Sequence, residues 1–522
     1  MDTAYTRRWW TLGVLSLALL IISMDNTILN VALPTISDEL GASSGQLQWI
    51  VDSYTLVFAG LLLVAGSLGD RFGRRRALEI GLGVFLVGSV SAAVSDSATM
   101  LIASRALMGV GAAFIMPSTL SVLTNVFPAE ERPKAIGIWA AVSGLGIAFG
   151  PITGGVLIEN LSWGWVFLIN VPVAGAALAL TRPLVPESKD PAAPNLDPFG
   201  AALSFAGLTS LLWAIIEAGG DRGWTDPAVM STFGLAAALL SAFVVWEMHA
   251  KSPMLDVRLF RDRRFSSSAA SITMVFFALF GTIFFLTQYL QSVLGYGPIT
   301  AGAAFIPVSV GMVVASQVSA RLSVRVGNRP VVTGGLALVG GGLALLSLAE
   351  ADSGYGLIAA ALLALGSGMG LAMTPATESL MSALPKEHAG VGSAMNDAVR
   401  QVGGALGVAV LGSLLSSGYR GDMETAVSGL PADAGEAASE GVGGAVAVAT
   451  KVGGQTGDSL AATAEQAFTS AMSTTVLIAA GAALIGSLLA AVLMPSKKAA
   501  AAPEPELELE PLAAEVAEPV AA

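Results

Sequence analysis

The sequence predicts an all-α membrane protein with fourteen transmembrane spans, and three observations support this fold class. First, 54% of the 522 residues are apolar and only 12% are charged, with a mean hydropathy of +0.72. Second, apolar runs of about 20 residues recur, each long enough to cross a hydrocarbon core of about 30 Å, where only a helix satisfies its own backbone hydrogen bonds. Third, basic residues concentrate in alternate connecting segments. A large soluble protein with buried helices does not explain the length of these runs.

We read the spans as apolar runs between charged or glycine- and proline-containing breakers. The first run follows Arg7 and Arg8 as in a signal peptide, but it is too long and no cleavage site follows, so we expect it to be retained. The first eight predicted spans are 10–31, 47–68, 77–94, 99–122, 135–157, 163–180, 199–218 and 228–246. The last six are 267–289, 301–320, 331–349, 355–381, 391–415 and 471–494.

The distribution of basic residues tests this count independently. With the N-terminus inside, 21 of the 26 lysines and arginines fall in inner segments. Three fall outside, namely Arg222, Arg420 and Lys451, and Arg105 and Arg400 lie within spans. A missed or extra span would exchange inner and outer for every later segment and destroy this asymmetry. The sequence therefore predicts a multi-pass protein with both termini in the cytoplasm.

An internal repeat divides the chain. The inner loops 68–75 and 322–329 share Leu, Arg, Gly and Arg at equal positions, and each follows the second span of a group of six. We therefore expect two six-span bundles, at 1–182 and 266–494, with two inserted spans at 183–265.

Two segments are expected to lie outside this helical framework. The Gly/Ala-rich segment 416–470 is predicted to be a flexible outer loop without an assigned fold. The tail 495–522, rich in Pro, Glu and Ala, is expected to be disordered and cytoplasmic, and its six glutamates contribute to the net charge of -12.

The composition excludes several kinds of chemistry. The chain has no cysteine, so disulfides, thiol catalysis and thiolate metal sites are ruled out. Its two histidines, His249 and His388, lie in short charged loops, and we interpret both as solvated. No G-x-x-x-x-G-K-[ST] run is present, so an ATP-driven pump acting alone is not expected. We predict no enzymatic activity, no metal, no cofactor and no nucleic-acid partner.

Several motifs resemble those of one transporter family. The stretch 66–76, GSLGDRFGRRR, resembles the inner-loop signature of the major facilitator superfamily. The stretches 25–34 (DNTILNVALP), 105–111 (RALMGVG) and 146–155 (GIAFGPITGG) are similar to motifs of the fourteen-span drug:proton antiporters within it. The stretch 163–172 also fits, although glycine stands at its second position where the family often has arginine.

This resemblance implies a major facilitator fold that exports small amphipathic drugs or antibiotics in exchange for protons, by alternating access across the bacterial cytoplasmic membrane. The proton gradient would supply the energy, and the partners would be lipid, substrate and protons, with the chain itself a monomer. Two alternatives stay open. A proton-coupled importer would have the same fold, although the 146–155 motif argues against it. A non-transporting membrane sensor or scaffold would leave charges within the spans unexplained.

Three charged residues within spans are the leading functional candidates, because a charge in the membrane is costly unless it is paired or hydrated. Asp25, Asp52 and Arg105 lie about 13, 8 and 10 Å from the outer ends of spans 1, 2 and 4. We predict that Asp25 takes up and releases the coupling proton and that Arg105 tunes it, because burial raises a carboxyl pKa and a nearby guanidinium lowers it. The alternatives are a static Asp25–Arg105 pair and, for Asp52, a hydrated residue at a span end.

The inner loop after span 2 is predicted to gate the inner side. Its glycines permit a tight reversal, its arginines hold it on the inner face, and its one acid can cap a helix or pair with the second half. The resemblance implies a latch between the halves that breaks during transport, whereas a topology anchor alone explains the arginines but not the acid. The gating residues are Gly66, Asp70, Arg71, Gly73, Arg74 and Arg75.

Span 5 is predicted to contain a hinge or seal between the halves. Its glycines at every fourth position share one face, where backbones can approach closely, and its proline bends the helix; ordinary close packing is the alternative. The residues are Gly146, Gly150, Pro151, Gly154 and Gly155.

Two further groups complete the candidate residues. Aromatic and amide side chains suit an adaptable substrate cavity, although an interfacial belt explains the tyrosine equally well. This group is Asn30, Gln288, Tyr289 and Gln291. Charged residues near the inner ends of spans 12 and 13 are predicted to form an ion-pair cluster that closes the inner side, in preference to a proton site. This group is Glu378, Asp397 and Arg400.

Overall fold

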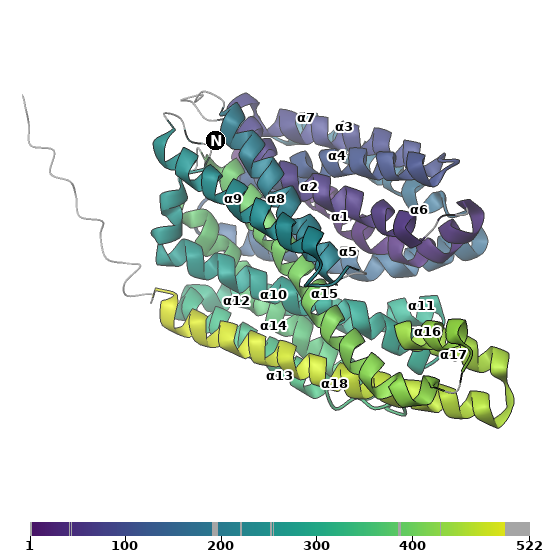
Figure 1. Cartoon of the computed structure of the whole chain (residues 1–522). Coiled ribbons are helices and arrows are strands. Elements are labelled where there is room, and N and C mark those ends of the chain that lie inside the picture. The colour runs from purple at the N-terminus through teal and green to yellow at the C-terminus, as the bar shows by residue number, and fades with distance from the viewer. Residues whose placement is uncertain are drawn as a thin grey trace, which may run out of the picture.

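The computed structural model describes residues 3–40, 42, 44–189, 197–219, 222–250, 253, 255–384, 388–428 and 430–495. Within these residues every regular element is helical, and fourteen helices are long and apolar enough to cross a membrane (Figure 1). They match the predicted spans one for one, so the predicted fold class is confirmed. The acidic tail after Pro495 lies outside the described residues. We use inner and outer for the faces predicted to be cytoplasmic and external.

The first bundle is built around α4, which lies between α2 and α3, while α1 packs on α5 and α7. Its sixth span is broken into a short and a longer helix. The elements are α1 (Thr3–Leu40), α2 (Ser44–Phe72), α3 (Arg74–Ala93), α4 (Ala98–Val126), α5 (Arg132–Asn160), α6 (Trp165–Leu168) and α7 (Asn170–Leu184).

The second bundle is built around α14, which lies between α12 and α13, while α10 packs on α15 and α18 packs on α13. The elements are η1 (Val257–Arg261), α10 (Arg263–Gln288), the π turn η2 (Tyr289–Val293), α11 (Pro298–Ala303), α12 (Ile306–Val326), α13 (Asn328–Leu346), α14 (Tyr355–Ser382), α15 (Ala389–Val427) and α18 (Gly454–Leu493). The inserted pair, α8 (Pro198–Gly219) and α9 (Pro227–His249), is joined to the bundles through contacts of α8 with α2 and α15.

The repeat seen in the inner loops has a structural counterpart. Gly73 directly precedes α3 with a φ of 120°, and Gly327 directly precedes α13 with a φ of 90°. Residues with a side chain rarely adopt this conformation, so both loops require glycine to turn from one helix straight into the next. The pairs α2–α3 and α12–α13 are therefore equivalent, whereas the domain bounds 1–182, 183–265 and 266–494 stay predictions.

The expectation of a flexible outer loop at 416–470 is wrong for the residues described there. The α15 helix continues through the start of this segment, α16 and α17 follow, and α18 begins well before the predicted last span. The buried Tyr419 hydroxyl donates a hydrogen bond of 3.0 Å to the carbonyl of Ala438, and Val442 is fully buried. Alanine-rich segments form helices once they have an apolar partner, which outweighs their glycine content. The bounds are Ala432–Glu440 for α16 and Val442–Val452 for α17.

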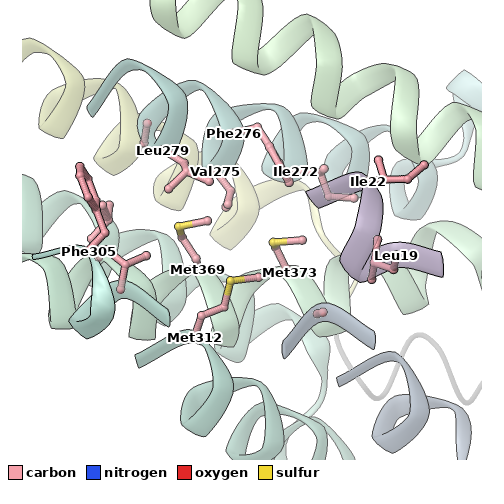
Figure 2. Packing of buried hydrophobic residues seen from close by; sticks show 14 of the residues in the cluster. Leu19, Ile22, Ile272, Val275, Phe276, Leu279, Phe305, Met312, Met369 and Met373 are labelled. Atoms are coloured by element: carbon pink, nitrogen blue, oxygen red, sulfur yellow. The ribbon is translucent and has the colours of Figure 1, made fainter. Parts of the chain in front are cut away.

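The two bundles meet along α2, α4 and α5 of the first and α12, α14 and α15 of the second. Figure 2 shows apolar residues of both bundles, where Leu19 and Ile22 of α1 belong to the same buried cluster as the methionines of α12 and α14. Methionine is flexible and polarizable, so it adapts to differently shaped neighbours. The three methionines are Met312, Met369 and Met373.

Candidate functional site

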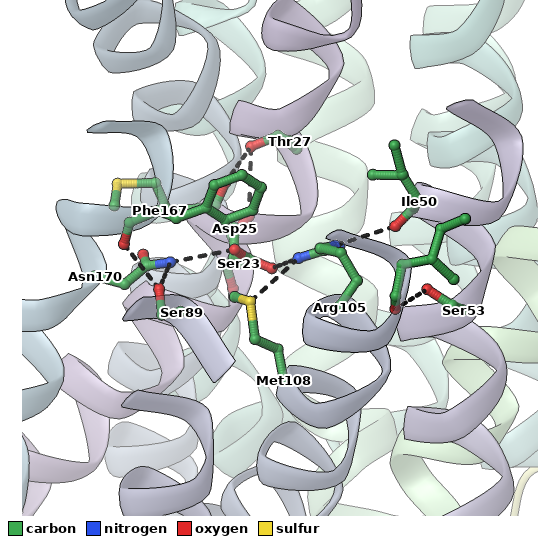
Figure 3. A network of polar contacts seen from close by, with 12 residues as sticks. Ser23, Asp25, Thr27, Ile50, Ser53, Ser89, Arg105, Met108, Phe167 and Asn170 are labelled. Atoms are coloured by element: carbon green, nitrogen blue, oxygen red, sulfur yellow. Dashed lines mark hydrogen bonds and ion pairs between the residues drawn. The ribbon is translucent and has the colours of Figure 1, made fainter. Parts of the chain in front are cut away.

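Asp25 and Arg105 form a direct ion pair inside the first bundle. The Arg105 Nη1 atom donates to the Asp25 Oδ2 atom at 2.6 Å and so joins α4 to α1 (Figure 3). The Asp25 side chain is 0% exposed and the Arg105 side chain 2%. Removing one partner of a buried pair leaves an uncompensated charge and costs about 3–5 kcal/mol. The structure thus brings together the two residues predicted to carry the proton chemistry.

The second carboxylate oxygen of Asp25 is held by a helix of the broken sixth span. The Asn170 Nδ2 atom, at the start of α7, donates to Asp25 Oδ1 at 3.2 Å and to Ser89 Oγ at 3.2 Å. Ser89 in turn donates to the carbonyl of Phe167 in α6 at 2.8 Å (Figure 3). The break between α6 and α7 therefore places the Asn170 amide against Asp25.

Arg105 has anchors other than Asp25. Its Nε atom donates to the carbonyl of Ile50 at 3.2 Å, and its guanidinium carbon lies 4.3 Å from the centre of the Tyr54 ring, both on α2. A cation over an aromatic face is attracted by the ring quadrupole, and the attraction is stronger when water is excluded. Arg105 would therefore stay attached to α2 if the bond to Asp25 were lost.

Sequence reasoning missed three residues of this network: Tyr54, Ser89 and Asn170. Asn170 gave a usable signal, because it is the one amide or charged residue of the predicted span 163–180. Serine and tyrosine are common within apolar spans, so the other two gave none. Asp52 is half-buried on α2 and its part as a functional candidate stays a prediction, while the side chain of Asn30 lies outside the described residues.

Asp70 connects the two bundles at the inner face. Its Oδ1 and Oδ2 atoms accept the backbone N–H groups of Gly390 at 2.9 Å and Val391 at 3.1 Å, in the first turn of α15. Arg74 donates to the same carboxylate from Nε at 2.8 Å and from Nη2 at 2.6 Å. A negative charge is favourable at a helix N-terminus, where N–H groups lack intrahelical partners. One carboxylate thus links α2, α3 and α15.

The other residues of the inner loop lie around this contact. Gly66 approaches the carbonyl of Gly390 so closely that a Cβ atom would lie 2.6 Å from it. The Arg75 Nε atom lies 3.7 Å from Glu187 in the segment after α7, and the Arg71 guanidinium lies 5.5 Å from the Phe72 ring. The contact between the bundles therefore runs at least through Gly66 and Asp70.

The predicted hinge in span 5 divides between two neighbours. Gly146, Gly150 and Gly154 lie against α1 of the same bundle, where a Cβ atom at any of them would overlap α1 side chains. This face therefore packs within the first bundle, which corrects its predicted place between the halves. Pro151 and Gly155 do contact the second bundle, at α11. Regular spacing identifies a shared face, but it does not show which neighbour that face meets.

The predicted inner cluster is also divided. Arg400 Nη1 lies 3.8 Å from Asp397 Oδ1, one turn apart on α15, and both side chains are buried. Glu378 is instead bonded to Asn328, whose Nδ2 atom donates to it at 2.7 Å, beside an inner cleft that Arg264 also lines. The grouping of Glu378 with the other two is therefore wrong, because depth along a helix says nothing of the direction in which a side chain points.

Three members of the aromatic and amide group, Gln288, Tyr289 and Gln291, lie at the outer end of the second bundle, whereas Asn30 belongs to α1 of the first. The ring of Tyr289 is fully buried, and its hydroxyl donates to the carbonyl of Glu350 at 2.6 Å. Gln288 is half-buried and Gln291 is exposed. Tyr289 thus ties η2 to the segment after α13, and a role of this group in substrate binding stays a prediction.

A family model and individual relatives both match this chain over most of its length. Residues 15–408 match the Major Facilitator Superfamily. The chain is 38% identical to the multidrug efflux pump LfrA of Mycolicibacterium smegmatis, over 91% of this chain and 94% of that protein. It is 34% identical to the tetracenomycin C resistance and export protein of Streptomyces glaucescens, over 79% of this chain and 76% of that protein.

Solved structures show the same fold at low sequence identity. The human organic anion transporter MFSD10 superposes with a TM-score of 0.60 at 14% identity, over 94% of this chain and 100% of that one. The proton:xylose symporter XylE gives a TM-score of 0.60 at 13% identity, over 94% of this chain and 96% of that one. At such identities the likeness concerns the fold alone.

Proposed function

This chain belongs to the major facilitator superfamily, and from that premise we propose that it exports small amphipathic drugs or antibiotics in exchange for protons. The names of the relatives, a multidrug efflux pump and an antibiotic export protein among them, support the substrate class and the direction. The observation that carries the proton coupling is the fully buried Asp25 carboxylate paired with Arg105.

In the ionised state, Asp25 holds three spans of the first bundle together. Its carboxylate receives Arg105 from α4 and Asn170 from α7, while Asp25 itself lies on α1. A proton on this carboxylate cancels the charge that attracts Arg105 and leaves the guanidinium buried without its counter-ion. Because an uncompensated buried charge costs several kcal/mol, the protonated bundle favours an arrangement in which Arg105 is better hydrated or differently paired.

The position of α1 links this change to the seam between the bundles. Asp25 lies within two turns of Leu19 and Ile22, α1 residues of the same buried cluster as the methionines of the second bundle (Figure 2). Arg105 keeps its contacts with Ile50 and Tyr54 on α2, so loss of the ion pair frees α1 rather than α4. Protonation of Asp25 would thereby change how α1 packs where substrate passes.

Asp25→Asn tests the proposal, because asparagine keeps the shape and removes the titratable group. In proteoliposomes with an imposed pH gradient, the variant should lose gradient-driven accumulation of substrate while retaining its expression level and monodisperse elution. Asp96→Asn, an exposed aspartate in the loop between α3 and α4, is the matched control and should transport normally. Coupled transport by Asp25→Asn at the wild-type rate would refute the role of Asp25.

The direction of transport needs its own assay. Inverted vesicles expose the inner face, so an exporter accumulates substrate in them when their lumen is acidified, whereas a proton-coupled importer does not. A protein that acts only as a sensor or scaffold would produce no substrate-induced pH change in proteoliposomes of either orientation.

A further inference from the structure

A buried cation joins the two bundles. The Arg400 guanidinium carbon, on α15, lies 4.6 Å from the ring centre of Trp139 on α5 and 5.2 Å from that of Phe276 on α10. Trp139 is fully buried, and its Nε1 atom donates to Thr119 of α4 at 3.2 Å. Arg400 is thus held between an aromatic ring of its own bundle and one of the opposite bundle.

The polar atoms around this cation are incompletely satisfied. Among the described residues, Arg400 Nε, Arg400 Nη2 and Asp397 Oδ2 are buried and have no hydrogen-bond partner. Asp397 Oδ1 accepts the Asn396 amide at 3.3 Å, and Arg400 Nη1 at 3.8 Å is too far for a hydrogen bond. Buried polar groups are nearly always hydrogen-bonded, and each exception requires a reason. Here two donors and one acceptor lie unused in one place.

The surroundings suit an aromatic guest. Phe276 belongs to the apolar cluster of Figure 2 together with Met312, Met369 and Met373, whose flexible side chains adapt to different shapes. Trp139 belongs to the first bundle and Arg400 to the second, so their contact breaks when the bundles move apart. The aromatic faces, the methionines and the unused polar atoms would then line the opened seam together.

We propose that Arg400, with Asp397 beside it, is a substrate-binding site that recognises uncharged aromatic compounds through their carbonyl or hydroxyl oxygens. The Nε and Nη2 atoms of Arg400 donate to those oxygens, and Asp397 Oδ2 accepts from a hydroxyl group. The two charges cancel, so the site favours a neutral guest over an ion. This inference rests on the proposed export function and names one substrate class for it.

The expected class of substrate follows from the charge of the Arg400 guanidinium. An aromatic cation could stack on Trp139, but it would meet the guanidinium that already occupies that face, and like charges repel strongly away from water. Loss of a hydrogen bond from a charged donor changes affinity about tenfold or more. A substitution at Arg400 should therefore change the binding affinity for neutral oxygen-bearing compounds more than the affinity for cations.

The test measures binding directly, by equilibrium dialysis of the purified full chain in nanodiscs. The probes are 1-hydroxyanthraquinone, which is neutral, anthraquinone-2-carboxylate, which is anionic, and ethidium, which is cationic. The first variant is Arg400→Lys, which keeps the charge but loses the forked donors. The matched control is Arg222→Lys, because Arg222 also lies over a tryptophan, Trp213 at 5.8 Å, but on the outer surface.

Arg400→Lys should weaken binding of 1-hydroxyanthraquinone at least tenfold and change ethidium binding less than threefold, while Arg222→Lys changes neither. Equal weakening of both probes, or no weakening of the neutral one, would overturn the proposal, since Arg400 would then be a packing residue only.

A second variant decides the matter if Arg400→Lys does not fold. Asp397→Asn is isosteric and turns the neutral pair into a net cation, so it should raise affinity for anthraquinone-2-carboxylate at least fivefold relative to 1-hydroxyanthraquinone. An unchanged ratio would contradict the proposal.

Transport and binding measured together distinguish a failure of the proposed Arg400 site from a failure of the proposed export function. If wild-type protein transports no probe under a pH gradient, the proposed function fails. If wild-type protein transports the probes and both variants bind them like wild type, the function stands and this site does not.

Discussion

Replacing Asp70 by asparagine should open the inner face of the protein. The Asp70 carboxylate accepts the N–H groups of Gly390 and Val391 at the first turn of α15, at 2.9 and 3.1 Å, and holds Arg74 as well. Asparagine has one oxygen, which can keep the bond to Gly390. Its NH2 group cannot accept from Val391, so one backbone N–H of α15 loses its partner in the closed state.

The size of the effect follows from these contacts. The lost hydrogen bond to a charged acceptor is worth about 1.5–3 kcal/mol, and the negative charge at the α15 N-terminus about 0.3–1 kcal/mol more. The closed state should therefore be destabilised by about 2–4 kcal/mol relative to any state in which α2 and α15 have parted, which multiplies the open fraction about 30- to 700-fold.

Distances between spin labels on the inner face measure this change. The chain has no cysteine, so no native residue has to be replaced before labelling. Phe72→Cys on α2 and Val324→Cys on α12 introduce the two labelled positions, one in each bundle. Both side chains are exposed, at 52% and 63%. Double electron–electron resonance on the labelled protein in nanodiscs measures the distance between the two labels. In Asp70→Asn, a longer distance between them should become dominant.

The control is Glu187→Gln, which removes an inner-face carboxylate that pairs with Arg75 and Arg76 of α3. It should leave the distance distribution unchanged. If Asp70→Asn also leaves it unchanged, the bond to α15 does not hold the inner face closed, and the latch that the inner loop implies is refuted.

Two further predictions concern stability. Gly150→Ala should lower the free energy of unfolding by about 1–3 kcal/mol, because the added Cβ overlaps α1, whereas Gly83→Ala, with nothing within 4 Å, should not; thermal unfolding of the purified variants checks both. The hydrogen bond from Arg8 holds the pKa of Glu131 below its ordinary value. Their pairing therefore stabilises the fold at pH values above the ordinary pKa of a glutamate, and this stabilisation is lost as the pH falls through the lowered pKa. Glu131→Gln should therefore reduce the fall in Tm on acidification, while Glu130→Gln should not, and a wild-type acid slope in Glu131→Gln would contradict this.

The fold was predictable because its strongest signals are long and redundant. Fourteen apolar runs, each separated by breakers, leave little freedom in counting helices, and the alternation of basic segments tests the count again. The equivalent glycines at 73 and 327 show that even the inner-loop repeat reflects backbone geometry. The outer segment 416–470 was misread because glycine and alanine carry no periodic contrast, so nothing in the sequence showed that its helices have a partner to pack on.

The site was only partly predictable, and the missing part has a physical cause. Position along a span gives the depth of a residue, and the matching depths of Asp25 and Arg105 were enough to suggest a pair. Depth says nothing of the direction in which a side chain points, which is why Glu378 was wrongly grouped with Arg400. Asn170 and Tyr54 reach the pair only because α7 starts after a break and α2 lies beside α4.

Two of the buried arginines, Arg105 and Arg400, are connected through residues of a single helix. Arg105 and Thr119 both lie on α4, a continuous helix of 29 residues, about 21 Å apart at 1.5 Å per residue. Thr119 accepts the Trp139 indole N–H, and Trp139 stacks on Arg400 of the second bundle. Pro117 lies between Arg105 and Thr119, and a proline inside a helix removes a backbone hydrogen bond and bends the axis, so α4 connects the two sites through a bend. Because Arg105 keeps its contacts with Ile50 and Tyr54 of α2, release of α1 leaves α4 in place, and we expect the aromatic contact at Trp139 to break when the bundles themselves move apart.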